Sequence, residues 1–304
     1  MIPVVDGRSL GKVLGTALLL GGVAGALLLT RDYTIRIVFV AALLIPAERL
    51  FALHKRPILR EGWRTDLAHF VVDPLVVTVG VAVPLALARL LIVDTDAATS
   101  LRAAVATHPR EVRLLEAFVI VALFDYVAHR LSHQVPLLWR FHALHHSPEQ
   151  LDWLVTARNH PINSAVVITF FVIPLEVLGL TPVVNGPFLA VFLLAIAFIE
   201  HANLSIRVPR GLRWVVPSPE FHHWHHARDV HCNYSNYPFV DALFRTAHHP
   251  VRERPASYGV ADPYPPSGYF AQLFFPFRRR TDTPVIARSA PAQAARALQI
   301  QPRT

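Results

Sequence analysis

The chain has 304 residues, of which 53% are hydrophobic and 16% are charged, and its mean hydropathy is +0.38. Soluble domains carry about 25% charged residues, so this composition indicates an integral membrane protein. The formal net charge is +8, but the basic residues are spread over short loops and a tail, which argues against a nucleic-acid-binding surface. The single Cys232 excludes an intramolecular disulfide and a metal site built from several cysteines.

The first predicted element is an uninterrupted apolar segment at residues 10–30. It is long enough to cross a bilayer core, which takes about 20 residues. A cleaved signal peptide is the alternative, because Arg8 and Lys12 precede the segment and small residues lie within it. The apolar run exceeds the usual ~7 to 15 residues of a signal core, so we expect a membrane span that is not cleaved.

Further apolar segments follow along the chain. They predict five more spans, at residues 34–53, 67–93, 112–128, 162–180 and 186–203. Prolines interrupt some of these runs, and they indicate either helices that tolerate proline or kinked and re-entrant pieces. Lys and Arg are in excess in the segments after the second, fourth and sixth spans, and such segments are usually cytoplasmic. We therefore expect an all-α, multi-pass membrane bundle of about six spans.

Histidines gather at the cytoplasmic ends of these segments. Residues 127–148 read VAHRLSHQVPLLWRFHALHHSP, and FHHWHH follows about 75 residues later. The spacings i, i+3 and i+4 place side chains on one helix face, roughly 5–6 Å apart. Neutral imidazole is a common ligand of transition metals. The candidate ligands by spacing are His129, His133, His142, His145, His146, His222, His225 and His226.

A lone histidine on an apolar face is usually a hydrogen-bonded core residue, but two HxxHH clusters and an HxxxH pair have no simple packing explanation. One zinc ion takes about three or four protein ligands, so eight histidines imply two metal ions. The residues alone leave iron, zinc and copper open. The position beneath an apolar bundle favours a redox pair that oxidises lipid C–H bonds. A dizinc hydrolase and a metal transporter or store are the alternatives, although transport requires ligands near the bilayer midplane.

These motifs resemble those of the sterol desaturase / fatty acid hydroxylase family of membrane di-iron enzymes. HRLSH is similar to the HxxxH box of the family, HALHH to its HxxHH box and HHWHH to its last box. His160 before Pro161 is similar to an HP element, His201 in HAN to a further family histidine, and residues 233–246 to an NYG...DxLFGT segment. By this resemblance His160 and His201, which are isolated in sequence, join the eight as metal ligands or immediate supports.

The resemblance covers residues 48–277 as one domain, with N-terminal membrane span or spans at 1–47 and a tail at 278–304 that is expected to be disordered. Within that domain, residues 204–276 are expected to form a cytosolic cap that completes the di-metal site. The implied cofactors are two iron ions with O2 as co-substrate, and the implied reaction is hydroxylation of a lipid C–H bond. Desaturation or demethylating oxidation is the alternative, and the lipid and the carbon remain open.

No flavin, haem or NAD motif is visible in the sequence. Electrons are therefore expected from a separate donor, such as a cytochrome b5-like protein, a ferredoxin or a reductase. The active site is expected on the cytoplasmic side of the membrane.

Five side chains near the motifs need separate interpretation. His223 points away from its neighbours and is expected near the metal site or at the surface, and Asp125 could accept a hydrogen bond from His129. Asn163 replaces an acid that often follows HP. Ser235 and Arg245 replace family glycines, which could alter turns because glycine often supplies a positive φ.

Overall fold

The computed structural model describes residues 33–184, 187–228, 230–250, 253–260 and 265–278. Within these ranges the chain is helical, with two isolated β-bridges and no β-strand. This confirms the all-α prediction. The expected first span at residues 10–30 lies outside the described residues, as does the tail from residue 279 onward.

Helices occupy most of the described chain. They are α2 (Tyr33–Leu50), α3 (Trp63–Ala88) with the π-helix η1 (Arg89–Val93), α4 (Asp96–Ala106), α5 (Arg110–Gln134), α6 (Pro136–His146), the 3-10 helix η2 (Trp153–Ala157), α7 (Pro161–Leu178), α8 (Thr181–Val184), α9 (Pro187–His201), α10 (Pro219–His225), α11 (Pro238–Leu243), α12 (Tyr269–Phe274) and the 3-10 helix η3 (Phe275–Phe277). Proline opens α6, α7, α10 and α11, where its missing N–H costs no helical hydrogen bond.

Helix α3 continued by η1 and helix α7 are long and apolar enough to cross a membrane, and they are the two such helices in the part of the chain that the structure describes. Only 11% of the most apolar window of α3 and η1 is buried. Leu75 is 74% exposed and Val83 is 69% exposed. An apolar surface of this extent is unfavourable in water and favourable against lipid.

Helices α2, α5 and α9 lie where three further spans are predicted, but they do not meet the same length and composition criterion. The six-span topology therefore stays a prediction. Pro74 and Pro84 lie inside α3, and Pro174 lies inside α7, without ending either helix. The two apolar runs are thus continuous helices, not re-entrant pieces.

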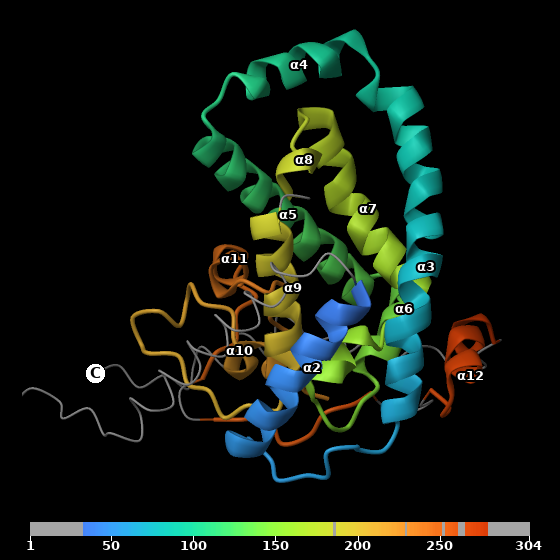
Figure 1. Cartoon of the computed structure of the whole chain (residues 1–304), viewed down its shortest axis with the longest axis vertical. Helices are drawn as coiled ribbons and strands as arrows, with labels where there is room; N and C mark the ends of the chain where they lie inside the picture. The colour runs from blue at the N-terminus through green and yellow to red at the C-terminus, as the bar shows by residue number, and fades with distance from the viewer. Residues whose placement is uncertain (1–32, 185–186, 229, 251–252, 261–264, 279–304) are drawn as a thin grey trace, which may run out of the picture.

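The long helices converge on one end of the bundle (Figure 1). Helix α7 packs against α3 and α5, and α9 packs against η2 and α10. Helix α4 lies across the opposite end, between α3 and α5. A buried cluster from α2, α3, η2 and α9 includes Leu44, Phe70 and Phe198. Helix α6 packs against α5, and α10 packs against α9, at the ends that carry the clustered histidines.

Candidate metal centre

Local sequence places the first set of histidines. His129 and His133 lie one turn apart near the end of α5. The backbone turns at Val135 and restarts as α6 at Pro136. The last turn of α6 carries three buried histidines, His142, His145 and His146. The short connection makes α6 fold back beside α5, so that both sets of imidazoles face one another.

Five imidazoles form a first group, which we call group one: His129, His133, His142, His146 and His225. The Nε2 atom of His142 lies 3.0 Å from that of His129 and 3.1 Å from those of His133 and His146. Each of the five offers a ring nitrogen within 4.8 Å of the others.

Four imidazoles form a second group, group two: His145, His201, His222 and His226. The Nε2 atom of His201, at the end of α9, lies 3.2 Å from that of His145 and 3.1 Å from those of His222 and His226. The last two are 3.1 Å from each other. Side chains from α6, α9 and α10 thus converge on one point.

Hydrogen bonding does not account for this convergence. A neutral imidazole nitrogen either donates one proton or accepts through one lone pair, so the Nε2 atom of His201 cannot bond to three others. Ligands held ~2.0–2.1 Å from one metal ion at right angles lie roughly 3 Å apart. The nitrogen spacing therefore fits the coordination shell of an ion.

The two groups adjoin each other. The ring of His146 in group one stacks on that of His226 in group two, with centroids 4.5 Å apart and planes 23° apart. His145 and His146 are also neighbours in sequence but belong to different groups. The arrangement fits two ions close together, as the number of histidines predicts.

Backbone carbonyl groups fix the tautomer of several rings. Nδ1 of His145 lies 3.1 Å from the carbonyl oxygen of Arg158, and Nδ1 of His225 lies 2.9 Å from that of Cys232. A carbonyl oxygen accepts only, so each Nδ1 carries the proton and donates it. The Nε2 atom then presents a lone pair to the cluster, as in metal-bound histidines. His225 Nε2 is buried and has no hydrogen-bond partner among the described residues, as expected for a ligand atom.

Burial keeps these imidazoles neutral. It lowers the pKa of His145 to about 4 and holds the pKa of His142 and His222 well below the usual value. The first cause is the cost of placing a charge in a dry interior, and neighbouring histidines add to it at His142 and His222. Neutral imidazole is the form that binds metal.

His160 lies outside both groups. Its Nδ1 accepts a hydrogen bond from the N–H of Ile162, which caps the start of α7. Its Nε2 lies 2.9 Å from the carbonyl oxygen of Leu273. Of the ten predicted site residues, nine come together and His160 instead joins α7 to α12.

The other expected neighbours are placed as follows. His223 is 1% exposed and lies 3.3 Å from the hydroxyl of Tyr258, so it is an interior residue and not a surface residue. Asp125 forms no hydrogen bond with His129 in the described structure. Asn163 is buried and donates to Asn159.

A buried ion network behind group two is absent from the sequence prediction. The carboxylate of Asp66 pairs with both Arg60 and Arg158, and Asp66 and Arg158 are 92 positions apart. The carbonyl oxygen of Arg158 accepts the proton of His145. Gly62 lies against this network, where an added Cβ would meet the guanidinium of Arg158 at 2.7 Å. The network thus supports His145 of group two, and no local spacing signals the network.

Residues 233–246 form a compact turn beside group one, where the ring centroid of Tyr234 lies 5.1 Å from that of His133. Asp241 accepts hydrogen bonds from the N–H groups of Tyr234 and Ser235, each at 2.8 Å, and from the hydroxyl of Thr246 at 2.6 Å. Arg245 has a φ of 57°, whereas Ser235 has no positive φ. The expectation about replaced glycines thus applies to Arg245 and not to Ser235.

Comparison with known proteins gives one family match, to fatty acid hydroxylase, over residues 114–246. The ornithine lipid hydroxylase OlsE of Rhizobium tropici is 32% identical over 184 residues, which are 59% of this chain and 55% of that protein. The alkylglycerol monooxygenase of Caenorhabditis elegans is 29% identical over 145 residues, 44% of this chain and 27% of that protein. The alkylglycerol monooxygenase of Danio rerio is 30% identical over 134 residues, which are 43% of this chain and 29% of that protein.

The chain therefore spans about half the length of the first relative and less than a third of the other two. No solved structure matches the chain. The family match contains all nine clustered histidines.

Proposed function

We propose, from the match of residues 114–246 to the fatty acid hydroxylase family, that the protein is a membrane-bound di-iron oxygenase that hydroxylates a lipid. The observation that carries the proposal is the pair of adjoining imidazole groups, each converging through Nε2 atoms on one point. Relatives named as a lipid hydroxylase and as monooxygenases support the same class of reaction.

The nine clustered histidines are the proposed metal ligands. They are His129, His133, His142, His146 and His225 for one iron ion, and His145, His201, His222 and His226 for the other. Imidazole-rich ligation suits iron. The bound iron pair would supply the activation of O2 and the oxidation of the C–H bond. His160 is proposed as a support that orders α7 beside the centre.

The protein itself supplies orientation and exclusion of water. The carbonyl groups of Arg158 and Cys232 hold His145 and His225 with Nε2 toward the centre. The ligands of group two are all buried, which keeps bulk water away from the reacting atoms. Such restraint is what a protein contributes to cofactor chemistry.

The substrate is proposed to be a membrane lipid, reached from the apolar surface of α3 and α7. We place the domain at residues 48–277, with the histidine centre on the cytoplasmic side of a six-span bundle. Two electrons per turnover would come from a separate donor, such as a cytochrome b5-like protein, a ferredoxin or a reductase. Desaturation or demethylating oxidation by the same centre is the alternative outcome.

Lipid analysis tests the proposal. Cells that produce the protein and cells that produce the His201→Ala variant are grown under labelled O2, and their lipids are compared by mass spectrometry. Hydroxylation predicts a lipid that gains one labelled oxygen atom only with the unaltered protein. A lipid that lacks two hydrogens would indicate desaturation. Identical lipid profiles at equal membrane abundance would contradict the proposed function.

A further inference from the structure

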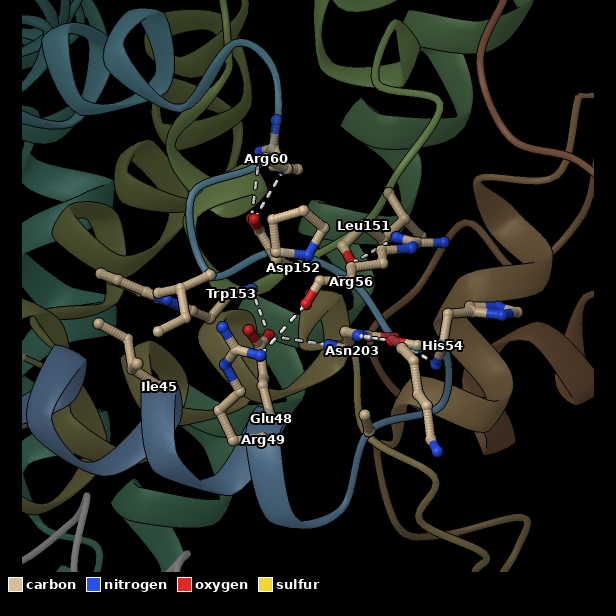
Figure 2. A pocket seen from close by; sticks show the side chains of 14 residues that line it. Ile45, Glu48, Arg49, His54, Arg56, Arg60, Leu151, Asp152, Trp153 and Asn203 are labelled. Carbon is tan, nitrogen blue, oxygen red and sulfur yellow. Dashed lines mark hydrogen bonds and ion pairs between the residues drawn. The ribbon is translucent and has the colours of Figure 1, made fainter.

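A second concave site lies outside the histidine centre. A pocket of about 260 Å³ opens where the end of α2 meets the loop that follows it and the segment before η2 (Figure 2). Its walls come from residues 45–60, from Leu151 to Trp153 and from Asn203. None of its lining residues belongs to either imidazole group.

Three basic side chains of the pocket have no acidic partner in the described structure. Arg49 and Lys55 are exposed, and Arg56 is partly buried. None of the three forms an ion pair with a described carboxylate. The two arginines form long hydrogen bonds to carbonyl oxygens, 3.4 Å from Arg49 to Arg56 and 3.4 Å from Arg56 to Leu151. Their guanidinium groups therefore keep free donors for an anion.

The two acids of the pocket are already used by the protein. Asp152 accepts from Arg60 at 2.6 and 3.1 Å and also from two backbone N–H groups. One oxygen of Glu48 accepts from the N–H groups of Trp153 at 2.9 Å and Asn203 at 2.8 Å. Figure 2 shows both acids directed toward these partners. The pocket therefore keeps the positive charge of Arg49, Lys55 and Arg56.

Exposed aliphatic side chains surround the basic ones. Leu50 is 76% exposed, and Ile58 and Leu59 are 54% and 58% exposed. Basic residues that alternate with exposed aliphatic residues are typical of a protein surface at the headgroup level of a bilayer. This favours a lipid headgroup over a freely soluble anion.

The pocket is connected to the framework around the histidine centre. Asn203 follows His201 by two positions, and its side chain bonds to both backbone groups of His54. Arg60, at the other wall, pairs with Asp66, which also pairs with Arg158. A molecule held in the pocket therefore rests on the same framework as the metal ligands.

We propose that this pocket binds the acidic headgroup, a phosphate or a carboxylate, of the lipid that the histidine centre oxidises. The proposal rests on the proposed function for the identity of the lipid as substrate. The headgroup lies against Arg49, Lys55 and Arg56, and the acyl chains lie among the aliphatic side chains beside them. Neutral lipids such as alkylglycerols lack the charge that the pocket recognises.

Lipid binding to the purified full chain tests this site. Native mass spectrometry measures binding of phosphatidic acid, of an acyl-ornithine lipid with a free carboxylate, and of neutral diacylglycerol, each with and without inorganic phosphate as competitor. The test variant is Arg49→Gln with Lys55→Gln, since both side chains are exposed and neither forms an ion pair with a described carboxylate. The control is Arg64→Gln, an exposed arginine of the same region outside the pocket.

We expect binding of the acidic lipids to weaken about tenfold for each charge removed, because each basic side chain would donate a charge-assisted hydrogen bond to the headgroup. Diacylglycerol binding, the metal content and the Arg64→Gln variant should be unchanged. Equal loss for acidic and neutral lipids, or for the control, would overturn the headgroup site. Displacement of the acidic lipids by inorganic phosphate at equal concentration would overturn it in favour of a free-anion site.

The binding measurement does not depend on turnover, so the two proposals fail separately. Selective binding of acidic lipid by a protein that oxidises no lipid would contradict the proposed function alone. Oxidation of lipid with no preference for acidic headgroups would contradict the headgroup site alone. In assays of purified protein with an added reductant, the double variant should raise the KM for the acidic lipid more than it lowers kcat.

Discussion

His201 makes more contacts with other ring nitrogens than hydrogen bonding allows. Its Nε2 atom is 3.1–3.2 Å from three other Nε2 atoms of group two. Replacing it by Ala removes the shared member of that group and leaves group one intact. We expect metal content to fall from about two ions to about one per chain and turnover to be lost.

Metal analysis of purified protein and lipid analysis of cells check this expectation. His108→Ala is the matched control, since His108 pairs with Glu116 at the far end of α5 and is partly exposed. It should keep both ions. If His201→Ala also kept two ions and normal turnover, the assignment of group two would be wrong.

A substitution at His160 tests whether this side chain binds metal or caps helix α7. Its two ring nitrogens contact Ile162 and Leu273, and neither is directed into a group. His160→Ala should therefore keep both ions and lower the free energy of unfolding by about 1 kcal/mol, the typical cost of losing a helix cap. His160→Asn, which can still cap α7, should recover most of that loss. Thermal unfolding and metal analysis measure the two effects, and loss of an ion would show that His160 is a ligand.

At the scale of elements, the turn at residues 233–246 contains a strained residue. Arg245 has a φ of 57°, a left-handed conformation that costs a side chain roughly 1–2 kcal/mol and costs glycine little. Arg245→Gly should raise the unfolding midpoint, with a gain of about 1 kcal/mol in the free energy of unfolding. Thermal unfolding in detergent measures it.

Ser235→Gly is the matched comparison for Arg245→Gly. Ser235 has no positive φ, and its hydroxyl accepts a hydrogen bond from the N–H of Tyr237 at 3.0 Å. Glycine would lose this contact and gain no relief of strain, so the protein should become less stable. A higher unfolding midpoint for Ser235→Gly than for Arg245→Gly would contradict the assignment of strain to Arg245.

The buried ion network links the start of α3 to the segment before α7. Asp66 is fully buried and pairs with Arg60 and Arg158, which are themselves buried. Asp66→Ala leaves two buried charges without this partner, and breaking such pairs costs about 3–5 kcal/mol. We expect low membrane abundance for this variant in immunoblots. Glu61→Ala, at an exposed position, should not change abundance, and equal abundance of both variants would show that the network contributes little.

At the scale of the molecule, the sequence predicts the features that depend on short-range patterns, namely the long helices and most of the clustered histidines. Apolar runs mark the helices α2, α3, α5, α7 and α9 because membrane helices require long apolar segments. Helical spacing identifies eight of the nine clustered histidines because i, i+3 and i+4 positions share a face. His201 has no partner at such a spacing, and the resemblance to a family, not periodicity, identifies it.

The rest depends on contacts between distant parts of the chain. Asp66 and Arg158 pair across 92 positions, and the pocket beside α2 joins three separate segments. Neither leaves a periodic signal. The helix cap made by His160 could not be predicted from the sequence either, because a histidine before proline at a membrane boundary is compatible with a metal ligand and with a helix cap. Helix α4 lies between two apolar runs and is amphipathic, so the search for spans passes over it.

The central claim is that two groups of imidazoles hold two iron ions. The direct measurement is the metal content of the full chain, purified without oxygen from cells supplied with iron and measured by elemental mass spectrometry against protein concentration. The account predicts about two iron ions per chain for the unaltered protein. Full occupancy by another metal, with iron near zero, would contradict it.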